Sequence, residues 1–136
     1  MLSRRQMEML VGYALLFWAA ATAWIRWVPW SVANTLRGDL GYLSSIPVCW
    51  LCIVLIRRRA RLSPSQLVAG SALVVGVATL LDASALRWAP FLHGHDERVL
   101  HLGATWLLWG YGVTLVLALL MQGRLGAPRS VEFRDA

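Results

Sequence analysis

The sequence predicts an all-α protein built as an antiparallel bundle of four transmembrane helices. Of its 136 residues, 58% are hydrophobic and only 15% are charged. A soluble domain of this size could not bury so much apolar surface. The charged residues cluster between long apolar segments, as in integral membrane proteins. We therefore expect one membrane domain over residues 1–121 and a polar, disordered cytoplasmic tail over residues 122–136.

Four apolar segments define the expected helices, at residues 9–26, 41–56, 67–86 and 99–121. The second segment is shorter than the roughly 20 residues that a bilayer requires, and Pro47 should kink it. Residues 31–41 are expected to form a polar connection before it. In the third segment, the spacing of Ala72 and Gly76 would let another helix approach closely.

A cluster of four arginines between the second and third segments determines the expected topology. Its members are Arg57, Arg58, Arg59 and Arg61. None can lie in hydrocarbon, where each would cost about 2.5–3.5 kcal/mol. This loop, the N-terminal segment and the tail together carry nine of the thirteen arginines. The positive-inside rule therefore predicts that both termini and this loop are cytoplasmic, in a bacterial inner membrane.

The same arginine distribution explains the net charge of +6, so we expect no nucleic-acid partner. The expected partner is the lipid bilayer. Because a bundle this small should enclose little space, we also expect a homo-oligomer or a second membrane protein as partner.

Three side chains near the outer ends of the helices form the first candidate site. Arg26, Asp82 and His101 belong to the first, third and fourth segments. A carboxylate inside a membrane needs a partner, and we expect Arg26 to pair with Asp82 while His101 adds a hydrogen bond. The cluster is either a site for an anion, a proton or a polar headgroup, or a structural ion pair.

Cys49 and Cys52 form the second candidate site, a CxxC pair within the second segment. Their spacing places both thiols on one helix face. The pair is either a redox centre or two packing thiols. It lies toward the cytoplasmic side, and the chain has no second cysteine pair with which to exchange electrons.

Histidines and tryptophans supply two further candidates. His93 and His95, completed by an acid or by His101, would suit a zinc or copper ion. Trp106 and Trp109 lie in the middle of the fourth segment. They serve either helix packing or the binding of a flat apolar ligand.

Two motifs give the chain a likeness to a known family. Thr79-Leu80-Leu81-Asp82 and the stretch Leu107-Leu108-Trp109-Gly110-Tyr111-Gly112 resemble those of small bacterial four-helix membrane proteins, the domain-of-unknown-function 5367 group. The resemblance extends over most of residues 10–121. It implies a bundle in the bacterial inner membrane with an Asp-bearing third helix. The family has no established activity to carry over.

These patterns favour a non-enzymatic accessory or structural membrane protein without a cofactor. The sequence contains no phosphate-binding loop, no Ser/His/Asp set and no paired catalytic carboxylates. One alternative is a small transporter or a binder of lipid or polar headgroups that uses Arg26, Asp82 and His101. Another is a membrane thiol redox protein that uses Cys49 and Cys52.

Overall fold

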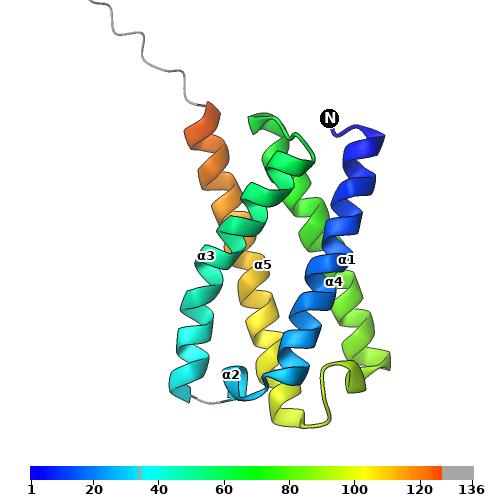
Figure 1. Ribbon diagram of the computed structural model, residues 1–136, viewed down its shortest axis with the longest axis vertical. Coiled ribbons are helices and arrows are strands. Elements are labelled where there is room, and N and C mark those ends of the chain that lie inside the picture. The colour runs from blue at the N-terminus through cyan, green and yellow to red at the C-terminus, as the bar shows by residue number, and fades with distance from the viewer. Residues whose placement is uncertain (34, 127–136) are drawn as a thin grey trace, which may run out of the picture.

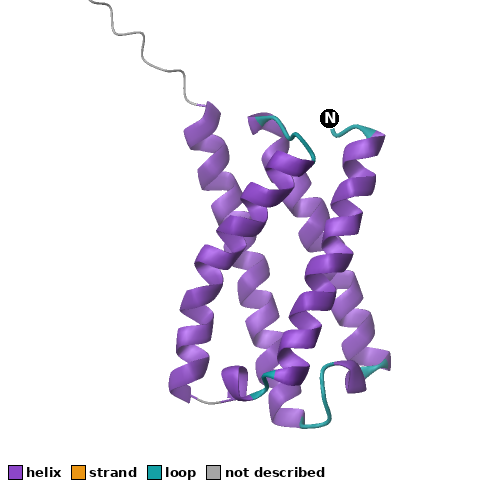
Figure 2. Cartoon of the chain, in the orientation of Figure 1, coloured by secondary structure: helices purple, strands orange, loops and turns teal. Residues whose placement is uncertain are grey.

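The computed structural model describes residues 1–33 and 35–126, and over these residues it is helical without strands (Figures 1 and 2). The four long helices are α1 (Arg4–Trp27), α3 (Thr35–Arg59), α4 (Leu67–Trp88) and α5 (Glu97–Gly126). Three short elements connect them: α2 (Trp30–Ala33), η1 (Pro64–Gln66) and η2 (Pro90–Leu92). The predicted all-α, four-helix architecture is confirmed.

All four long helices are apolar enough to cross a membrane, and the crossing segments contain between 24 and 30 residues. Large apolar side chains cover their outer faces: Leu16 is 58% exposed, Leu80 71% and Leu108 64%. Such a surface would be costly in water but matches lipid tails. The chain is therefore a multi-pass membrane protein.

The helices alternate in direction, so the connections alternate between the two ends of the bundle. The N-terminus, the α3–α4 connection and the end of α5 lie at one end, while α2 and η2 lie at the other (Figure 1). Within the bundle, α1 packs on α4, α4 on α5 and α5 on α3. In contrast, α1 and α3 are not packed directly against each other along their length.

The predicted boundaries of the second helix, residues 41–56, are wrong. The helix α3 has 25 residues, and α2 occupies part of the expected polar connection. The polar residues Arg37 and Asp39 are accommodated in its first turns, where they reach the membrane surface. Arg37 lies 5.2 Å from the centre of the Trp30 ring and so joins the two helices. Pro47 is the middle residue of α3, and the helix bends about midway along its length in Figure 1.

The predicted tail also begins too early. Residues 122–126 continue α5, and residues 127–136 lie outside the described residues. The helix continues through Gly123, a residue that weakens a helix without ending it as proline would, and its last described residue is Gly126.

Two apolar clusters hold the bundle together. One lies toward the η1 end and is centred on Leu10, Ile53, Ile56 and Leu67. The other lies toward the η2 end and contains Ile25, Val32, Val99 and Leu107. Between them, the bundle is less completely filled.

Close helix approach occurs at glycines other than the predicted pair. A Cβ atom on Gly103 would lie 3.1 Å from Cγ2 of Ile25, so a side chain there would require Ile25 to shift by a few tenths of an ångström. Ala72 and Gly76 are exposed on α4, and a Cβ on Gly76 would meet nothing within 4 Å. The predicted role of Ala72 and Gly76 in helix approach is therefore wrong for contacts within the described bundle.

Candidate functional site

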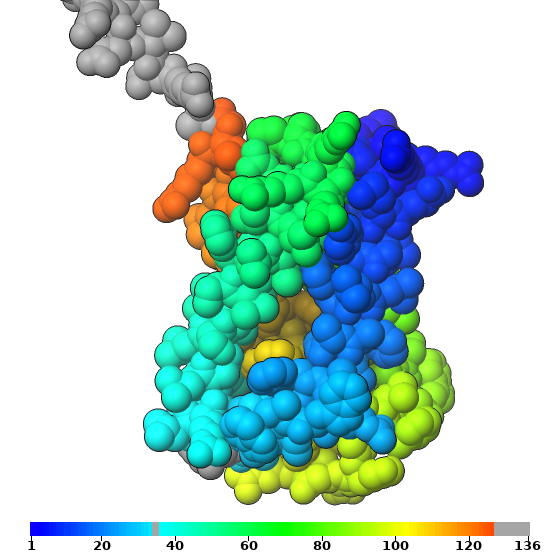
Figure 3. Space-filling model, in the orientation of Figure 1, coloured from blue at the N-terminus to red at the C-terminus, as the bar shows by residue number. Residues whose placement is uncertain are grey.

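A cavity of about 520 Å³ lies among α1, α3, α4 and α5. Figure 3 shows a hollow between α1 and α3, with atoms of α5 visible at its base. The cavity opens there because α1 and α3 do not pack on each other. In a membrane, this side of the bundle faces lipid. The cavity is therefore accessible from the bilayer.

The cavity wall is mainly apolar, and none of the described residues that form it is charged. Phe17 comes from α1, Ile53 from α3, Val74 and Ala78 from α4, and Leu107 from α5. Ligand sites of about 300–1,000 Å³ with mainly apolar walls and a few polar groups are typical of proteins that bind small molecules. The cavity has the size and lining of such a site.

Two polar atoms in this wall lack a hydrogen-bond partner among the described residues. They are Nε1 of Trp18 on α1 and Oγ of Ser71 on α4, and both atoms are buried. Ser71 is 0% exposed. Buried polar atoms are nearly always satisfied by protein, water or a ligand. Both atoms have almost no accessible surface, so a molecule in the cavity cannot contact them in this arrangement of the side chains.

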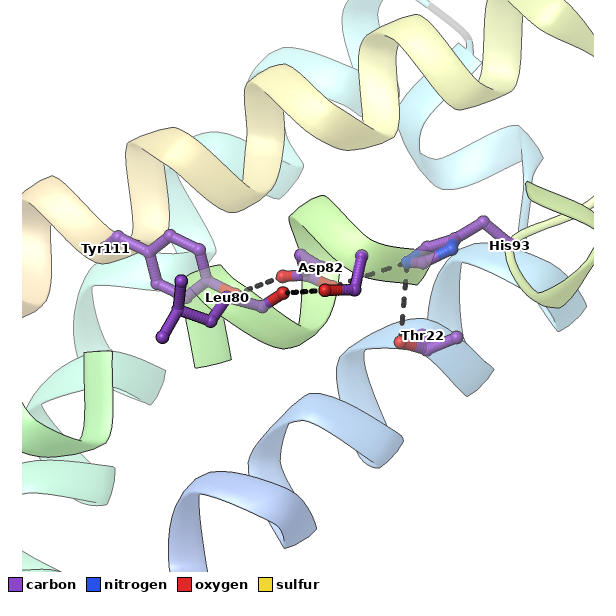
Figure 4. A network of polar contacts seen from close by, with 6 residues as sticks. Thr22, Leu80, Asp82, His93 and Tyr111 are labelled. Carbon is purple, nitrogen blue, oxygen red and sulfur yellow. Dashed lines mark hydrogen bonds and ion pairs between the residues drawn. The ribbon is translucent and has the colours of Figure 1, made fainter. Parts of the chain in front are cut away.

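A buried chain of polar side chains lies beside the cavity (Figure 4). The hydroxyl of Tyr111 on α5 donates a hydrogen bond to Oδ2 of Asp82 on α4. Nε2 of His93 lies 3.4 Å from Oδ1 of Asp82 and 3.4 Å from Oγ1 of Thr22 on α1. The His93–Asp82 contact is longer than a charge-assisted hydrogen bond, so it is an electrostatic contact rather than an aligned bond. Asp82 is 5% exposed and His93 is 1% exposed.

This chain connects two separate spaces. Tyr111 forms part of the cavity wall. His93 forms part of the wall of a second pocket, of about 300 Å³, at the η2 end of the bundle, together with Arg26, His95 and Asp96. Asp82 lies between Tyr111 and His93 (Figure 4). The arrangement places a titratable pair between a polar surface pocket and an apolar cavity.

The structure does not bring Arg26, Asp82 and His101 together as predicted. Nη1 of Arg26 donates to the carbonyl oxygen of Phe91 at 2.7 Å, and this bond ties η2 to the end of α1. His101 is exposed on α5. It lies two residues, about 200°, from the buried Gly103, which faces Ile25 of α1, so it points away from the buried face of α5. Asp82 obtains its partners from His93 and Tyr111 instead.

The predicted metal ligands His93 and His95 also diverge. His93 is buried and faces Asp82, whereas His95 is exposed. Gly94 between them has φ +135°, a backbone conformation that favours glycine. Over residues 1–33 and 35–126, no three side chains of the metal-binding types are close enough to hold an ion.

Both cysteine thiols are free and half-buried, and both line the cavity. Sγ of Cys49 lies 3.6 Å from the carbonyl oxygen of Gly110, to which it donates. This contact joins α3 to α5 as a packing thiol would. A redox role for the pair stays a prediction.

The two tryptophans in the middle of α5 attach this helix to α3. Nε1 of Trp106 donates to Gly41 O at 3.4 Å, and Nε1 of Trp109 donates to Tyr42 O at 3.1 Å. Trp109 also donates to Ser45 Oγ at 3.1 Å. Only Trp106 lines the cavity. It is therefore the one of the two that is placed to contact a ligand there.

Sequence reasoning missed Thr22, Trp18, Ser71 and the role of Tyr111. Helical spacing gave a usable signal for two of them. Ser71 precedes Asp82 by 11 residues, three turns of helix, and Tyr111 follows the buried Leu107 by four. The partners of Asp82 could not be read in this way, because they come from two other segments, α5 and the loop after η2.

Comparison of the chain with known protein families, curated proteins and solved structures finds no match. The geometry of the cavity and of the polar chain is therefore the basis for assigning a function.

Proposed function

We propose that the chain is a non-enzymatic protein of the bacterial inner membrane that binds a lipophilic molecule in the cavity among α1, α3, α4 and α5. The observation that carries this proposal is the cavity itself: about 520 Å³, without charged lining residues, and open between α1 and α3. A water-soluble polar solute would lose its hydration there without compensation. A lipophile entering sideways from the bilayer would not.

Inside a membrane, binding depends on how well a ligand fits the cavity and not on how hydrophobic the ligand is. Lipid tails are as apolar as the cavity wall, so burial from water supplies no driving force once the ligand is in the bilayer. Affinity then depends on shape and on hydrogen bonds. The aromatic wall, with Phe17, Trp24 and Trp106, offers shape.

The proposed orientation places both termini and the arginine cluster in the cytoplasm. It is supported by the positive-inside rule and by the position of the arginine cluster at the same end of the bundle as the N-terminus (Figure 1). The resemblance to the domain-of-unknown-function 5367 group supports the bacterial inner membrane as the location.

The expectation of a homo-oligomer or a membrane-protein partner stays a prediction. It was based on the bundle being too small to enclose a ligand, and the cavity removes that reason. An accessory role remains compatible with ligand binding, since a lipophile-binding subunit can serve a larger membrane complex.

The proposal is tested by photo-crosslinking with a diazirine-bearing long-chain hydrocarbon probe in nanodiscs. Gly110 lines the cavity, and a Cβ atom on it would meet nothing within 4 Å. In the variant Gly110→Leu, a side chain occupies this space. Gly112→Leu is the matched control, because Gly112 is exposed on the same helix and outside the cavity wall.

We expect adducts on cavity-lining peptides of the wild type and of Gly112→Leu, and at least tenfold fewer in Gly110→Leu. A tenfold loss corresponds to about 1.4 kcal/mol. Equal labelling of the two variants, or adducts confined to outward-facing residues such as Leu80 and Leu108, would contradict the proposal.

Proton-coupled transport is the second candidate, and the polar chain favours it. An ionisable group inside a membrane protein is by default a candidate for ion or proton movement. Here Asp82 lies between the surface pocket at His93 and the cavity wall at Tyr111. Proton flux measured in proteoliposomes distinguishes the two candidate functions. A flux that is present in the wild type and lost in Asp82→Asn supports transport. An equal flux in the two proteins contradicts it.

A further inference from the structure

The arginine cluster lies at the η1 end of the bundle and carries a charge that the described chain does not neutralise. Its members are the half-buried Arg57 and the exposed Arg58, Arg59 and Arg61. Within residues 1–33 and 35–126, none of these four side chains makes a hydrogen bond or an ion pair. Glu8 is the one described acid at this end, and its carboxylate already pairs with Arg4 at 3.2 Å. The cluster is therefore free to bind an anion.

The cluster lies at the level where lipid phosphates are found. The apolar part of α3 ends at Ile56, and the arginines follow it directly. Since a guanidinium group is costly in hydrocarbon, the surface of the hydrocarbon core must lie close to Arg57. Lipid headgroups begin at that surface, and arginine binds phosphate oxygens through paired N–H donors. This placement holds whichever side of the membrane the η1 end faces.

The backbone that carries the cluster is held in one shape. Nε2 of Gln6 on α1 donates to the carbonyl oxygens of Ala60 at 3.1 Å and of Arg61 at 3.4 Å. The N–H of Leu62 donates to the carbonyl oxygen of Arg57 at 2.9 Å, and the Leu62 side chain is buried in the apolar cluster toward the η1 end. Because the connection is ordered before a ligand arrives, binding costs less conformational entropy.

Arg61 occupies a backbone conformation that favours glycine. Its φ of +51° lies in the left-handed region, where the Cβ atom of an L-residue is crowded. Glycine is the usual residue at this point after a helix, because it ends the helix without that strain. Arginine therefore weakens the turn, and its presence is consistent with a role for its charge.

The spacing of the arginines suits a ligand with more than one phosphate group. Successive side chains on a helix project about 100° apart, so Arg57, Arg58 and Arg59 point in different directions. One phosphate group cannot engage all of them. Two linked phosphate groups can engage two arginines, and the second contact is then intramolecular and is favoured by a high effective concentration.

We propose that the arginine cluster is a binding site for the headgroup of an anionic phospholipid that carries two phosphate groups. Cardiolipin is a lipid of this chemistry, and basic sites at the ends of membrane helices suit it. None of the four arginines lines the cavity, so the site is separate from the one described above. The inference goes beyond the proposed function and does not rest on it.

The test is native mass spectrometry of the full chain released from detergent micelles, which counts the lipids bound. Cardiolipin is compared with phosphatidylglycerol, which has one phosphate group, at equal total phosphate, and with the zwitterionic phosphatidylcholine. We expect cardiolipin to be retained at about fivefold lower phosphate concentration than phosphatidylglycerol, and phosphatidylcholine to be retained least. Equal retention of cardiolipin and phosphatidylglycerol would overturn the preference for two phosphate groups.

A pair of matched double variants locates the site. Arg58→Gln with Arg61→Gln should weaken cardiolipin binding by at least about tenfold, since each arginine near a membrane surface contributes about fivefold. Arg87→Gln with Arg98→Gln removes the same charge from exposed residues at the η2 end, and it should leave cardiolipin binding unchanged. Equal weakening in the two double variants would show that lipid follows the overall charge, and the proposed site would be wrong.

The variant Arg61→Gly separates lipid binding from damage to the fold. Glycine relieves the strain of the left-handed backbone, so the melting temperature without lipid should stay the same or rise. Cardiolipin binding should nevertheless weaken by about fivefold. A lower melting temperature with unchanged cardiolipin binding would instead assign Arg61 a structural role and contradict its part in the site.

Discussion

The buried environment of Asp82 is determined by the face of α4 on which this residue lies. The buried positions of α4 recur every three or four residues, and Ala78, Asp82 and Ala85 share this face. A carboxylate there is removed from both water and lipid, so it needs partners. The hydroxyl of Tyr111 and the imidazole of His93 supply them.

The variant Tyr111→Phe should lower the free energy of unfolding by about 1 kcal/mol, since it leaves Oδ2 of Asp82 without its donor. The measurement is unfolding in mixed detergent micelles. Tyr13→Phe is the control, because the hydroxyl of Tyr13 makes no hydrogen bond within the described residues. Equal stability of the two variants would show that the Tyr111–Asp82 bond contributes nothing.

Cys49 and Cys52 should both remain reduced in cells. They line a cavity that opens toward lipid, and the Cys49 thiol donates to a backbone carbonyl of α5. Acid quenching followed by alkylation in denaturant and intact-mass measurement should show two adducts per chain. A sizeable fraction with no adduct and a mass two hydrogens lower would instead support the redox alternative.

Among the helices, close packing depends on glycine at one position of α5. A methyl group at Gly103 would press on Ile25, which is 0% exposed and packed on all sides. Overpacking of this kind typically costs about 1–3 kcal/mol. The higher helix propensity of alanine offsets up to about 1 kcal/mol of this cost. Gly103→Ala should therefore be less stable than the wild type by about 1 kcal/mol in thermal or detergent unfolding.

Gly76→Ala is the control for Gly103→Ala. Its Cβ would enter open space, and alanine is the better helix former by up to about 1 kcal/mol. We expect the stability of this variant to match or exceed that of the wild type. If both substitutions had the same effect, packing of α5 against α1 at Gly103 would not limit stability.

The gap between α1 and α3 results from the helices on which each of them packs. α3 is held by α5 through Tyr42, Trp106 and Trp109, and α1 is held by α4. Toward the η1 end, Leu10 of α1 and Ile53 of α3 belong to one buried cluster, but the two helices are not closely packed along the rest of their length. The cavity therefore opens at the one side of the bundle where two neighbouring helices are not directly packed.

For the whole molecule, the topology is tested with single cysteines in a Cys49→Ala, Cys52→Ala background. Ser65 and His95 are exposed at opposite ends of the bundle. A membrane-impermeant maleimide added to intact spheroplasts should label His95→Cys and spare Ser65→Cys. Inside-out vesicles should give the reverse pattern. Labelling of Ser65→Cys in intact spheroplasts would invert the proposed orientation.

The sequence alone determined the class, the number of helices and their alternation. These follow from the length of each apolar segment and from the cost of placing arginine in hydrocarbon, which are local properties of the chain. The helix limits at Thr35 and Gly126 were not predicted. Polar residues in a terminal turn can reach the membrane surface, so composition does not mark where such a helix ends.

Only the tertiary structure decided the site. Asp82 was predicted to need a partner, but Arg26 and His101 point elsewhere, and the partners come from α5 and from the loop after η2. The cavity itself has no sequence signal, because it results from the spacing of α1 and α3. Helix formation depends on residues that are near in sequence. The pairing of side chains and the position of a cavity depend instead on how each helix is rotated and on which helices pack against it.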